Sequence, residues 1–301
     1  MQDEPTKRIS IQRYQGLTTS ETDSDLRSYQ VQPCDDLVAV EEPLEIRISF
    51  GPAEQRRSKS LAITMRTPGN DAELAIGFLR SENVIQTADQ IEKIEHVGPP
   101  PEDGTHGNTL MVDLAANVEF SIEQLQRHFY MTSSCGVCGK ASIEAVIEQG
   151  FQPVATTIQL TPEIIANLPA NLRTQQTVFD ATGGLHAAGL FNSKGEPNTL
   201  SEDVGRHNAV DKLVGKQMQD QQANFPQPGR VLVVSGRASF ELVQKALTAS
   251  FEVLIAVGAP SSLAIHLAEE FNLTLIGFTS KKKFNVYSGY DRVRFLDNSS
   301  A

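Results

Sequence analysis

Residues 231–277 read VLVVSGRASFELVQKALTASFEVLIAVGAPSSLAIHLAEEFNLTLIG, and the architecture of the chain follows from this segment. Three continuous apolar runs alternate in it with two amphipathic helical stretches: the runs lie at 231–234, 253–257 and 273–276, and the stretches at 240–251 and 261–271. Strands that are apolar on both faces are typical of a sheet that is covered by helices on both sides. Alternation of strands with helices favours parallel pairing. The sequence therefore predicts an α/β fold with a mostly parallel sheet.

Small and hydroxyl-bearing residues follow each apolar run. They are Ser235, Gly236 and Arg237 after the first run, residues 258–262 after the second, and residues 277–280 after the third. Ligands of parallel sheets bind beyond the carboxyl ends of the strands, and a helix N-terminus at that edge favours a phosphate. Three lysines at 281–283 add positive charge, a solvated turn being the alternative interpretation. The sequence has neither a dinucleotide G-x-G-x-x-G motif after a strand nor a P-loop, so it predicts a phosphate site of another kind.

The rest of the chain divides into segments of different composition. This α/β lobe spans 151–297 of the 301 residues, and four other segments are predicted: a polar, disordered leader at 1–30, a smaller α+β lobe at 31–130, a loop and helix at 131–150, and a tail at 298–301. The leader has too few apolar residues to form a core. In the smaller lobe, runs at 44–48, 61–66 and 109–114 predict strands and Asp71 begins a helix.

Composition excludes several classes of protein. The formal net charge of −11 at pH 7 argues against wrapping duplex nucleic acid. No apolar run approaches the ~20 residues that span a bilayer, and the polar N-terminus lacks the core of a signal peptide. Three cysteines are too few for a disulfide scaffold. We therefore expect a cytoplasmic protein.

Residues 133–139 read SSCGVCG and hold Cys135 and Cys138. Apolar residues recur at helical spacing immediately afterwards, so the sequence predicts both thiols on a glycine-rich loop before a helix N-terminus. The helix dipole and Lys140 favour the thiolate, which is the form that attacks sulfur or binds metal. The remaining cysteine, Cys34, is predicted to be a packing residue. The spacing thus indicates sulfur or metal chemistry rather than a disulfide.

A glycine-rich cluster follows at residues 182–189, which read TGGLHAAG. Glycines on both sides of His186 indicate that the backbone approaches another group closely there. Because a single histidine is more often a structural residue, both a structural role and a ligand-binding role stay open for His186.

Residues 202–212 read EDVGRHNAVDK and begin another amphipathic helix. Its apolar positions predict a buried face, and Glu202 with Asp203 would suit its N-terminal end. Arg206 and His207 could bind an anion or position a thiol. A surface helix with mixed charges is the alternative interpretation.

Taken together, residues 133–139, 182–189, 202–212 and 234–241 resemble the FdhD family, the accessory sulfurtransferases of formate dehydrogenase. The motifs occur in family order, and the resemblance covers residues 35–297. It implies a cytidine-deaminase-like second lobe, a smaller α+β N-terminal lobe, and homodimers in the cytoplasm.

The resemblance also implies a function. A member of this family would take sulfur from a cysteine desulfurase as a persulfide and pass it to the molybdenum or tungsten bis(molybdopterin guanine dinucleotide) cofactor of formate dehydrogenase. Cys135 would carry the persulfide, assisted by Cys138, and no resident cofactor or metal is expected. The family's cofactor contact corresponds to Phe278, Thr279, Ser280, Lys281, Lys282 and Lys283. Further anion contacts are predicted at Ser235, Gly236, Arg237, His186, Arg206 and His207.

Three other functions compete with this one. A zinc-dependent nucleobase deaminase would use Cys135, Cys138 and His186 as ligands, but Ser134 replaces the motif's proline and Ala188 stands where the catalytic glutamate belongs. A cofactor chaperone that moves no sulfur would need the phosphate site alone. A thiol oxidoreductase would require a thioredoxin-like β-α-β setting around the cysteines, which is absent from the pattern.

Overall fold

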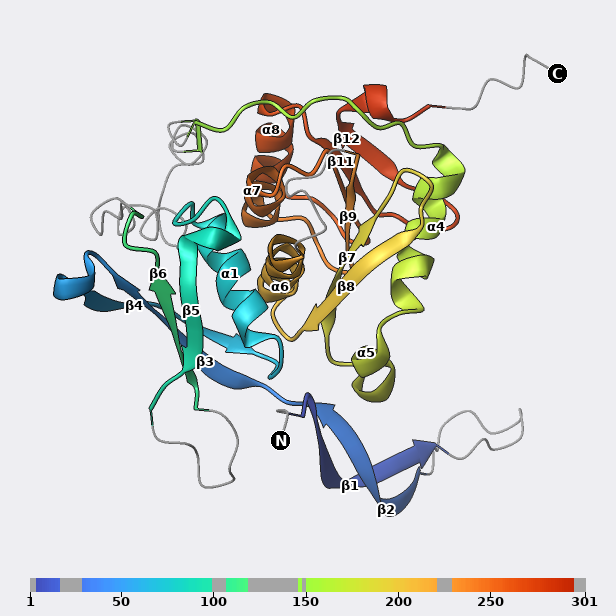
Figure 1. Ribbon diagram of the computed structural model, residues 1–301. Coiled ribbons are helices and arrows are strands. Elements are labelled where there is room, and N and C mark those ends of the chain that lie inside the picture. The colour runs from blue at the N-terminus through green and yellow to red at the C-terminus, as the bar shows by residue number, and fades with distance from the viewer. Residues whose placement is uncertain are drawn as a thin grey trace, which may run out of the picture.

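The three apolar runs form the parallel centre of a six-stranded sheet, as predicted (Figure 1). In the computed structural model, residues 4–16, 29–98, 107–118, 146–147, 150–220 and 229–294 are described. The runs are β9 (Val231–Val234), β10 (Val253–Ala256) and β11 (Thr274–Gly277), and every residue in them is buried. The order of strands in the sheet is β12-β11-β10-β9-β7-β8.

The sheet is mixed, which corrects the expectation of a mostly parallel one. Three other strands complete it: β7 (His186–Phe191), β8 (Pro197–Asp203) and β12 (Asn285–Ser288). Only two of its five neighbouring strand pairs are parallel. The length of the connections explains two of the antiparallel pairs, β7–β8 and β11–β12, because residues 192–196 and 278–284 are too few to carry a crossover helix and must return the chain antiparallel.

Helices cover both faces of this sheet (Figure 1). The helices that follow the strands are α6 (Arg206–Gln219), α7 (Phe240–Thr248) and α8 (Ser262–Glu270), and the opposite face carries α4 (Pro162–Arg173), which continues into α5 (Thr177–Thr182). Leu232 and Leu254 belong to the core on the α6–α8 side, whereas Val233 and Ile255 belong to the core that α4 covers. Burial on both faces explains why these strands are continuously apolar. None of the described helices is long and apolar enough to cross a membrane.

A four-stranded sheet with one helix forms the smaller lobe and confirms the three predicted strands. Its elements are β3 (Glu42–Phe50), β4 (Arg57–Arg66), β5 (Ile91–His96), β6 (Thr109–Leu114) and α1 (Asp71–Ser81), with the short 3-10 helices η1 (Ala53–Gln55) and η2 (Ala88–Gln90). The strand order is β4-β3-β6-β5. The fourth strand, β5, was not among the predictions. A third 3-10 helix, η3 (Tyr290–Arg292), follows β12.

The two lobes share one hydrophobic core, because α1 packs directly on α6. Two glycines allow this close crossing. A Cβ at Gly77 would overlap the backbone carbonyl of Asp211, and a Cβ at Gly215 would overlap the backbone of Glu73. The lobe boundary in the sequence is therefore not a break in the packing.

An antiparallel ladder occupies much of the segment that composition assigns to a disordered leader. Strand β1 (Thr6–Gly16) pairs along its whole length with β2 (Tyr29–Ala39). Most side chains of the two strands are exposed and none is buried, so the ladder depends mainly on backbone hydrogen bonds and leaves no apolar pattern in the sequence. Cys34 lies in β2 opposite Ile11 and is half-buried.

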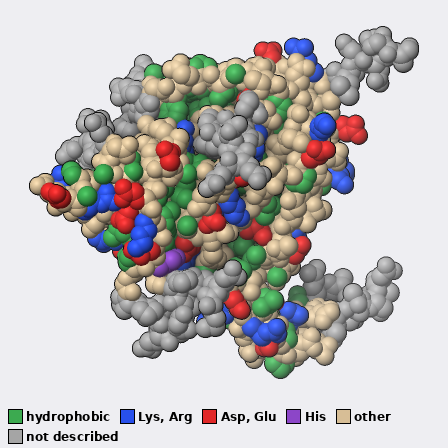
Figure 2. Space-filling model, viewed as in Figure 1, with side chains coloured by type: hydrophobic (Ala, Val, Ile, Leu, Met, Phe, Trp, Pro, Cys, Tyr) green, Lys and Arg blue, Asp and Glu red, His purple; other side chains and the backbone are tan. Residues whose placement is uncertain are grey.

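Charged side chains of both signs are mixed over the face shown in Figure 2 rather than gathered by sign. An extended basic area, as a nucleic-acid-binding face requires, is not visible on this side of the protein.

Candidate functional site

The carboxyl ends of β9, β10 and β11 lie side by side, as the sequence predicts. The backbone N–H of Gly258 donates to the carbonyl of Gly236 at 2.9 Å, and the N–H of Phe278 donates to the carbonyl of Gly258 at 3.0 Å. Ser235 joins them to β7, since its Oγ accepts the N–H of Ala187 at 2.9 Å. The three strand ends and the start of β7 therefore form one continuous edge.

A cavity of about 730 Å³ opens at this edge, and we call it the strand-end cavity. It brings together five of the predicted site residues: His186, Ser235, Thr279, Ser280 and Lys281. They come from three different strand ends, so only the folded sheet assembles them.

The opposite wall of the strand-end cavity comes from α4 and α5, which the sequence analysis did not connect with the site. Arg173 lies over the ring of Phe179 at 4.5 Å and pairs with Asp180 at 2.6 Å. A sequence signal for this wall does exist, because Thr161 followed by Pro162 is a typical helix start, and the Thr161 hydroxyl accepts the N–H of Ile164. Nothing in the pattern alone indicates that this helix borders the strand ends.

His186 and Arg206 converge on Gly236. A Cβ at Gly236 would lie 3.5 Å from Nδ1 of His186 and 3.8 Å from Cδ of Arg206. Burial lowers the pKa of His186, and the charge of Arg206 lowers it further, while Asp203 acts in the opposite direction. His186 is therefore a neutral imidazole near neutral pH, able to donate from one ring nitrogen and accept at the other.

Two buried donors at this edge lack a hydrogen-bond partner within the part of the chain that the structure describes. They are Nε of Arg206 and Oγ1 of Thr279, whose side chain is only 2% exposed. A buried polar group without a partner costs about 1–3 kcal/mol. A ligand with oxygen acceptors would remove that cost.

His207 contacts the N-terminal turn of α7. Its Nε2 lies 3.2 Å from Oγ of Ser239 and 3.4 Å from a carboxylate oxygen of Glu241. Burial, together with the charges of Lys245 and Arg206, lowers the pKa of His207 to about 4. The described contacts of His207 thus belong to the α6–α7 junction and not to the strand-end cavity.

The other predicted cations and the aromatic residue lie on the surface near the cavity. Arg237 is exposed and its side chain passes over Gly258, where a Cβ would lie 2.9 Å from Cγ of Arg237. Lys282 and Lys283 are exposed in a turn that Ser280 closes, its N–H donating to the carbonyl of Lys283 at 2.9 Å. Phe278 is 46% exposed, with a left-handed φ of 51°.

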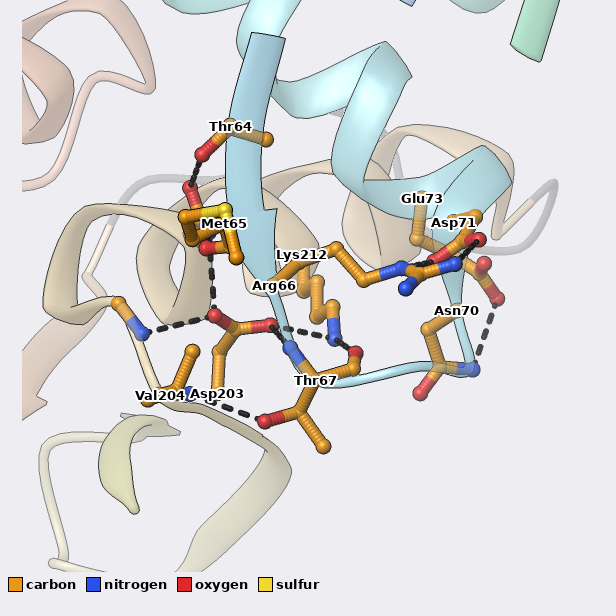
Figure 3. A network of polar contacts seen from close by, with 12 residues as sticks. Thr64, Met65, Arg66, Thr67, Asn70, Asp71, Glu73, Asp203, Val204 and Lys212 are labelled. Carbon is orange, nitrogen blue, oxygen red and sulfur yellow. Dashed lines mark hydrogen bonds and ion pairs between the residues drawn. The ribbon is translucent and has the colours of Figure 1, made fainter. Parts of the chain in front are cut away.

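A buried polar network holds the segment that leads into Arg206 (Figure 3). Asp203 is fully buried and accepts hydrogen bonds from Lys212 Nζ at 2.7 Å, Thr67 N–H at 3.1 Å and Gly205 N–H at 2.8 Å. Lys212 also donates to the carbonyl of Thr67 at 2.7 Å. Since Thr67 belongs to the smaller lobe, this network joins both lobes beside the site.

Glu202 and Asp203 lie in β8, which corrects their predicted place at the end of a helix. Asp203 is buried in this network because the buried ammonium of Lys212 requires a counter-charge. The carboxylate of Glu202 accepts the backbone N–H groups of Val178 at 3.1 Å and Phe179 at 2.9 Å. Glu202 therefore fixes α5, one wall of the strand-end cavity.

Cys135 and Cys138, the predicted sulfur-carrying residues, lie outside the described residues, as does Lys140. Of the helix predicted after them, residues 146–147 are described and are helical, with Val146 buried in the common core.

Comparison with known proteins places the chain in a family. The model of the FdhD/NarQ family matches residues 39–294. The chain is 49% identical over 271 residues to the "Sulfur carrier protein FdhD" of Streptomyces coelicolor, covering 89% of this chain and 93% of that one. It is 43% identical over 273 residues to the protein of that name from Mycobacterium tuberculosis, covering 89% and 95% of the two chains.

A solved structure shares the fold. The crystal structure of "a putative formate dehydrogenase accessory protein from Desulfotalea psychrophila" superposes with a TM-score of 0.64 at 23% identity, covering 95% of this chain and 99% of that one.

Proposed function

Because this chain belongs to the FdhD/NarQ family, we propose that it is a sulfur carrier that takes part in the maturation of formate dehydrogenase. The names of its relatives, which it matches over most of their length, support a sulfur-carrying role. The accessory-protein description of the Desulfotalea psychrophila structure supports formate dehydrogenase as the client. The protein would act in the cytoplasm and as a homodimer.

Sulfur would enter through Cys135. Its thiolate attacks the terminal sulfur of a persulfide on a cysteine desulfurase, a new S–S bond forms on Cys135, and the desulfurase cysteine leaves as a thiolate. This exchange involves no net oxidation. The Cys138 thiolate would then attack the inner sulfur of the Cys135 persulfide, so that a Cys135–Cys138 disulfide forms, the S–S bond to the outer sulfur breaks, and that sulfur leaves as sulfide for the molybdenum or tungsten cofactor. A thiol reductant would reduce the disulfide before the next cycle.

The strand-end cavity would hold the guanine dinucleotide part of that substrate. The observation that carries this assignment is the buried Thr279 Oγ1, which lines the cavity with Lys281 and lacks a partner within the described chain. Nε of Arg206, whose side chain lies against Gly236, is a second such donor. Phosphate oxygens would accept from these donors. The exposed ring of Phe278 is available to stack on the base, and the neutral His186 can hydrogen-bond to it or to the ribose.

Sulfur loading tests the carrier function. We expect that the protein, incubated with a cysteine desulfurase and cysteine, gains the mass of one sulfur atom on the peptide that contains Cys135 and Cys138. Cys34 serves as the internal control, because its peptide should gain no sulfur. Mass spectrometry of peptides prepared without reductant measures both. Absence of added sulfur on Cys135 and Cys138 would refute the carrier function.

Guanosine diphosphate tests the strand-end cavity. We expect Thr279→Val and Arg206→Met each to weaken its binding by about tenfold, because each removes a donor to a charged phosphate. Isothermal titration calorimetry measures the affinity. Lys194→Ala, at the exposed β7–β8 turn, is the control and should bind as the wild type does. Unchanged affinity in both cavity variants would place the nucleotide elsewhere.

A further inference from the structure

A second cavity, of about 750 Å³, lies between the two lobes. Its walls include the first turn of α1, Ser201 of β8 and Lys216 of α6. Leu185 borders both this interlobe cavity and the strand-end cavity, so the two are neighbours with separate polar linings. The proposed sulfur-carrier function makes no use of the interlobe cavity.

The first turn of α1 presents uncapped backbone donors to the interlobe cavity. A helix leaves its first four N–H groups without partners inside the helix, and the N-cap side chain normally accepts one of them. The N-cap residue Asn70 has a left-handed φ of 60° and makes no such bond; its amide instead donates to Glu73 at 3.4 Å. Figure 3 shows this turn beside Arg66 and Lys212.

Ser201 provides an independent observation that points to a ligand. Its side chain is 2% exposed and lines the interlobe cavity, yet its Oγ has no hydrogen-bond partner within the described chain. Native proteins rarely leave a buried hydroxyl unpaired. The adjacent carbonyl of Leu200 accepts from Nζ of Lys216 at 3.1 Å, which places that ammonium next to Ser201.

Contacts between α1 and α6 bring these donors together. Gly215 lies directly against the backbone of Glu73, so the neighbouring Lys216 reaches the first turn of α1. Burial lowers the pKa of Lys216, as expected of an ammonium that has lost part of its hydration, and the carboxylate of Glu73 acts on this pKa in the opposite direction.

The carboxylates around the interlobe cavity are largely engaged elsewhere. Both oxygens of Asp71 accept from Arg66 at 3.0 Å. Both oxygens of Glu202 cap α5, and Glu95 pairs with Lys93 at 2.7 Å.

Glu73, which also lines this cavity, accepts from the Asn70 amide at 3.4 Å and lies close enough to Lys216 to act on its charge. The buried hydroxyl of Ser201 is the group that lacks a partner within the described chain, and an acceptor would supply one.

We propose that the interlobe cavity binds a small oxyanion, a phosphate or a carboxylate, through Ser201, Lys216 and the first turn of α1. Its contacts would come from both lobes, so bound anion would stabilise their packing. A ligand that binds only the folded protein stabilises it by RT ln(1 + [L]/Kd), so the midpoint of thermal unfolding rises with the logarithm of the ligand concentration above Kd.

Thermal unfolding of the full chain, followed in sodium phosphate, sodium acetate and sodium chloride at equal ionic strength, tests this proposal. We expect the midpoint to rise with anion concentration in phosphate, in acetate or in both, relative to chloride, and the two arms distinguish the sources. Ser201→Ala and Lys216→Met should each need an anion concentration about tenfold higher to reach the same rise. Ser201→Ala should retain its midpoint in chloride, because the deleted hydroxyl has no partner.

Lys194→Ala, at the exposed β7–β8 turn and outside both cavities, is the matched control and should keep the wild-type response to both ions. A response that Arg206→Met removes and Ser201→Ala retains would assign the anion to the other cavity and overturn the proposal, as would the absence of any stabilisation relative to chloride. Guanosine diphosphate binding by Ser201→Ala should equal that of the wild type. Failure of the proposed nucleotide site and failure of this site are therefore separable.

Discussion

Formate dehydrogenase matured in cells whose only copy of this protein carries Cys135→Ser and Cys138→Ser is expected to be inactive. A serine oxygen cannot hold a transferable sulfur atom as a persulfide does, because the exchange requires a thiolate. Formate oxidation in extracts of such cells, compared with wild-type cells and with cells lacking the protein, measures the effect. The double variant should match the cells that lack the protein.

Two controls show whether the loss of activity is specific to the sulfur chemistry of Cys135 and Cys138. Cys34→Ser should support full activity, since Cys34 lies in the β1–β2 ladder outside the strand-end cavity. The purified double variant should bind guanosine diphosphate with wild-type affinity, because both cysteines would act only on sulfur. Full client activity with the double variant would instead establish a cofactor chaperone that moves no sulfur.

The strand-end variants should show the converse behaviour. Arg206→Met removes a donor at the sheet edge and leaves the cysteine loop unchanged, so this variant should still accept sulfur from the desulfurase while binding nucleotide weakly. Acceptance of sulfur and recognition of its recipient would then be separate tasks of two parts of the chain. Only their combination would sulfurate the cofactor.

The sequence predicts the centre of the fold well for a physical reason. Strands β9 to β11 are buried on both faces, so nearly every residue in them must be apolar and the pattern is unambiguous. Strand β12 has no buried residue except Ser288, and the β1–β2 ladder is exposed on both faces. Their pairing rests on backbone hydrogen bonds, which leave little trace in side-chain composition.

The site was predictable only in part for a related reason. His186, Ser235 and Thr279 stand at strand ends, where the topology of a parallel sheet brings ligand contacts together. The α4–α5 wall reaches the strand-end cavity through packing that no local pattern encodes. Asp203 illustrates the same limit. Its charge in the sequence suggests a helix end, but in the structure it lies in β8, where it pairs with the buried Lys212.

Asp203→Ala is expected to lower the free energy of unfolding by about 3–5 kcal/mol, because it leaves the ammonium of Lys212 buried without its counter-charge. The substitution also removes the acceptor for the backbone N–H groups of Thr67 and Gly205. Urea-induced unfolding followed by circular dichroism measures the loss. Asp35→Ala in the β1–β2 ladder is the control: its partner Arg8 is exposed at 3.9 Å, and the loss should stay within about 1 kcal/mol.

A second variant separates the cost of leaving the Lys212 ammonium unpaired from the cost of removing the Asp203 side chain. Combining Asp203→Asn with Lys212→Met removes both charges and keeps one acceptor oxygen, which can still accept the N–H of Gly205, so the double variant should be more stable than Asp203→Ala. Its guanosine diphosphate affinity should also be closer to that of the wild type, since the segment leading into Arg206 keeps the hydrogen bond of Gly205. If the double variant were as unstable as Asp203→Ala, the network would act through packing and hydrogen bonds alone. The ion pair between Asp203 and Lys212 would then contribute nothing to holding Arg206 at the strand ends.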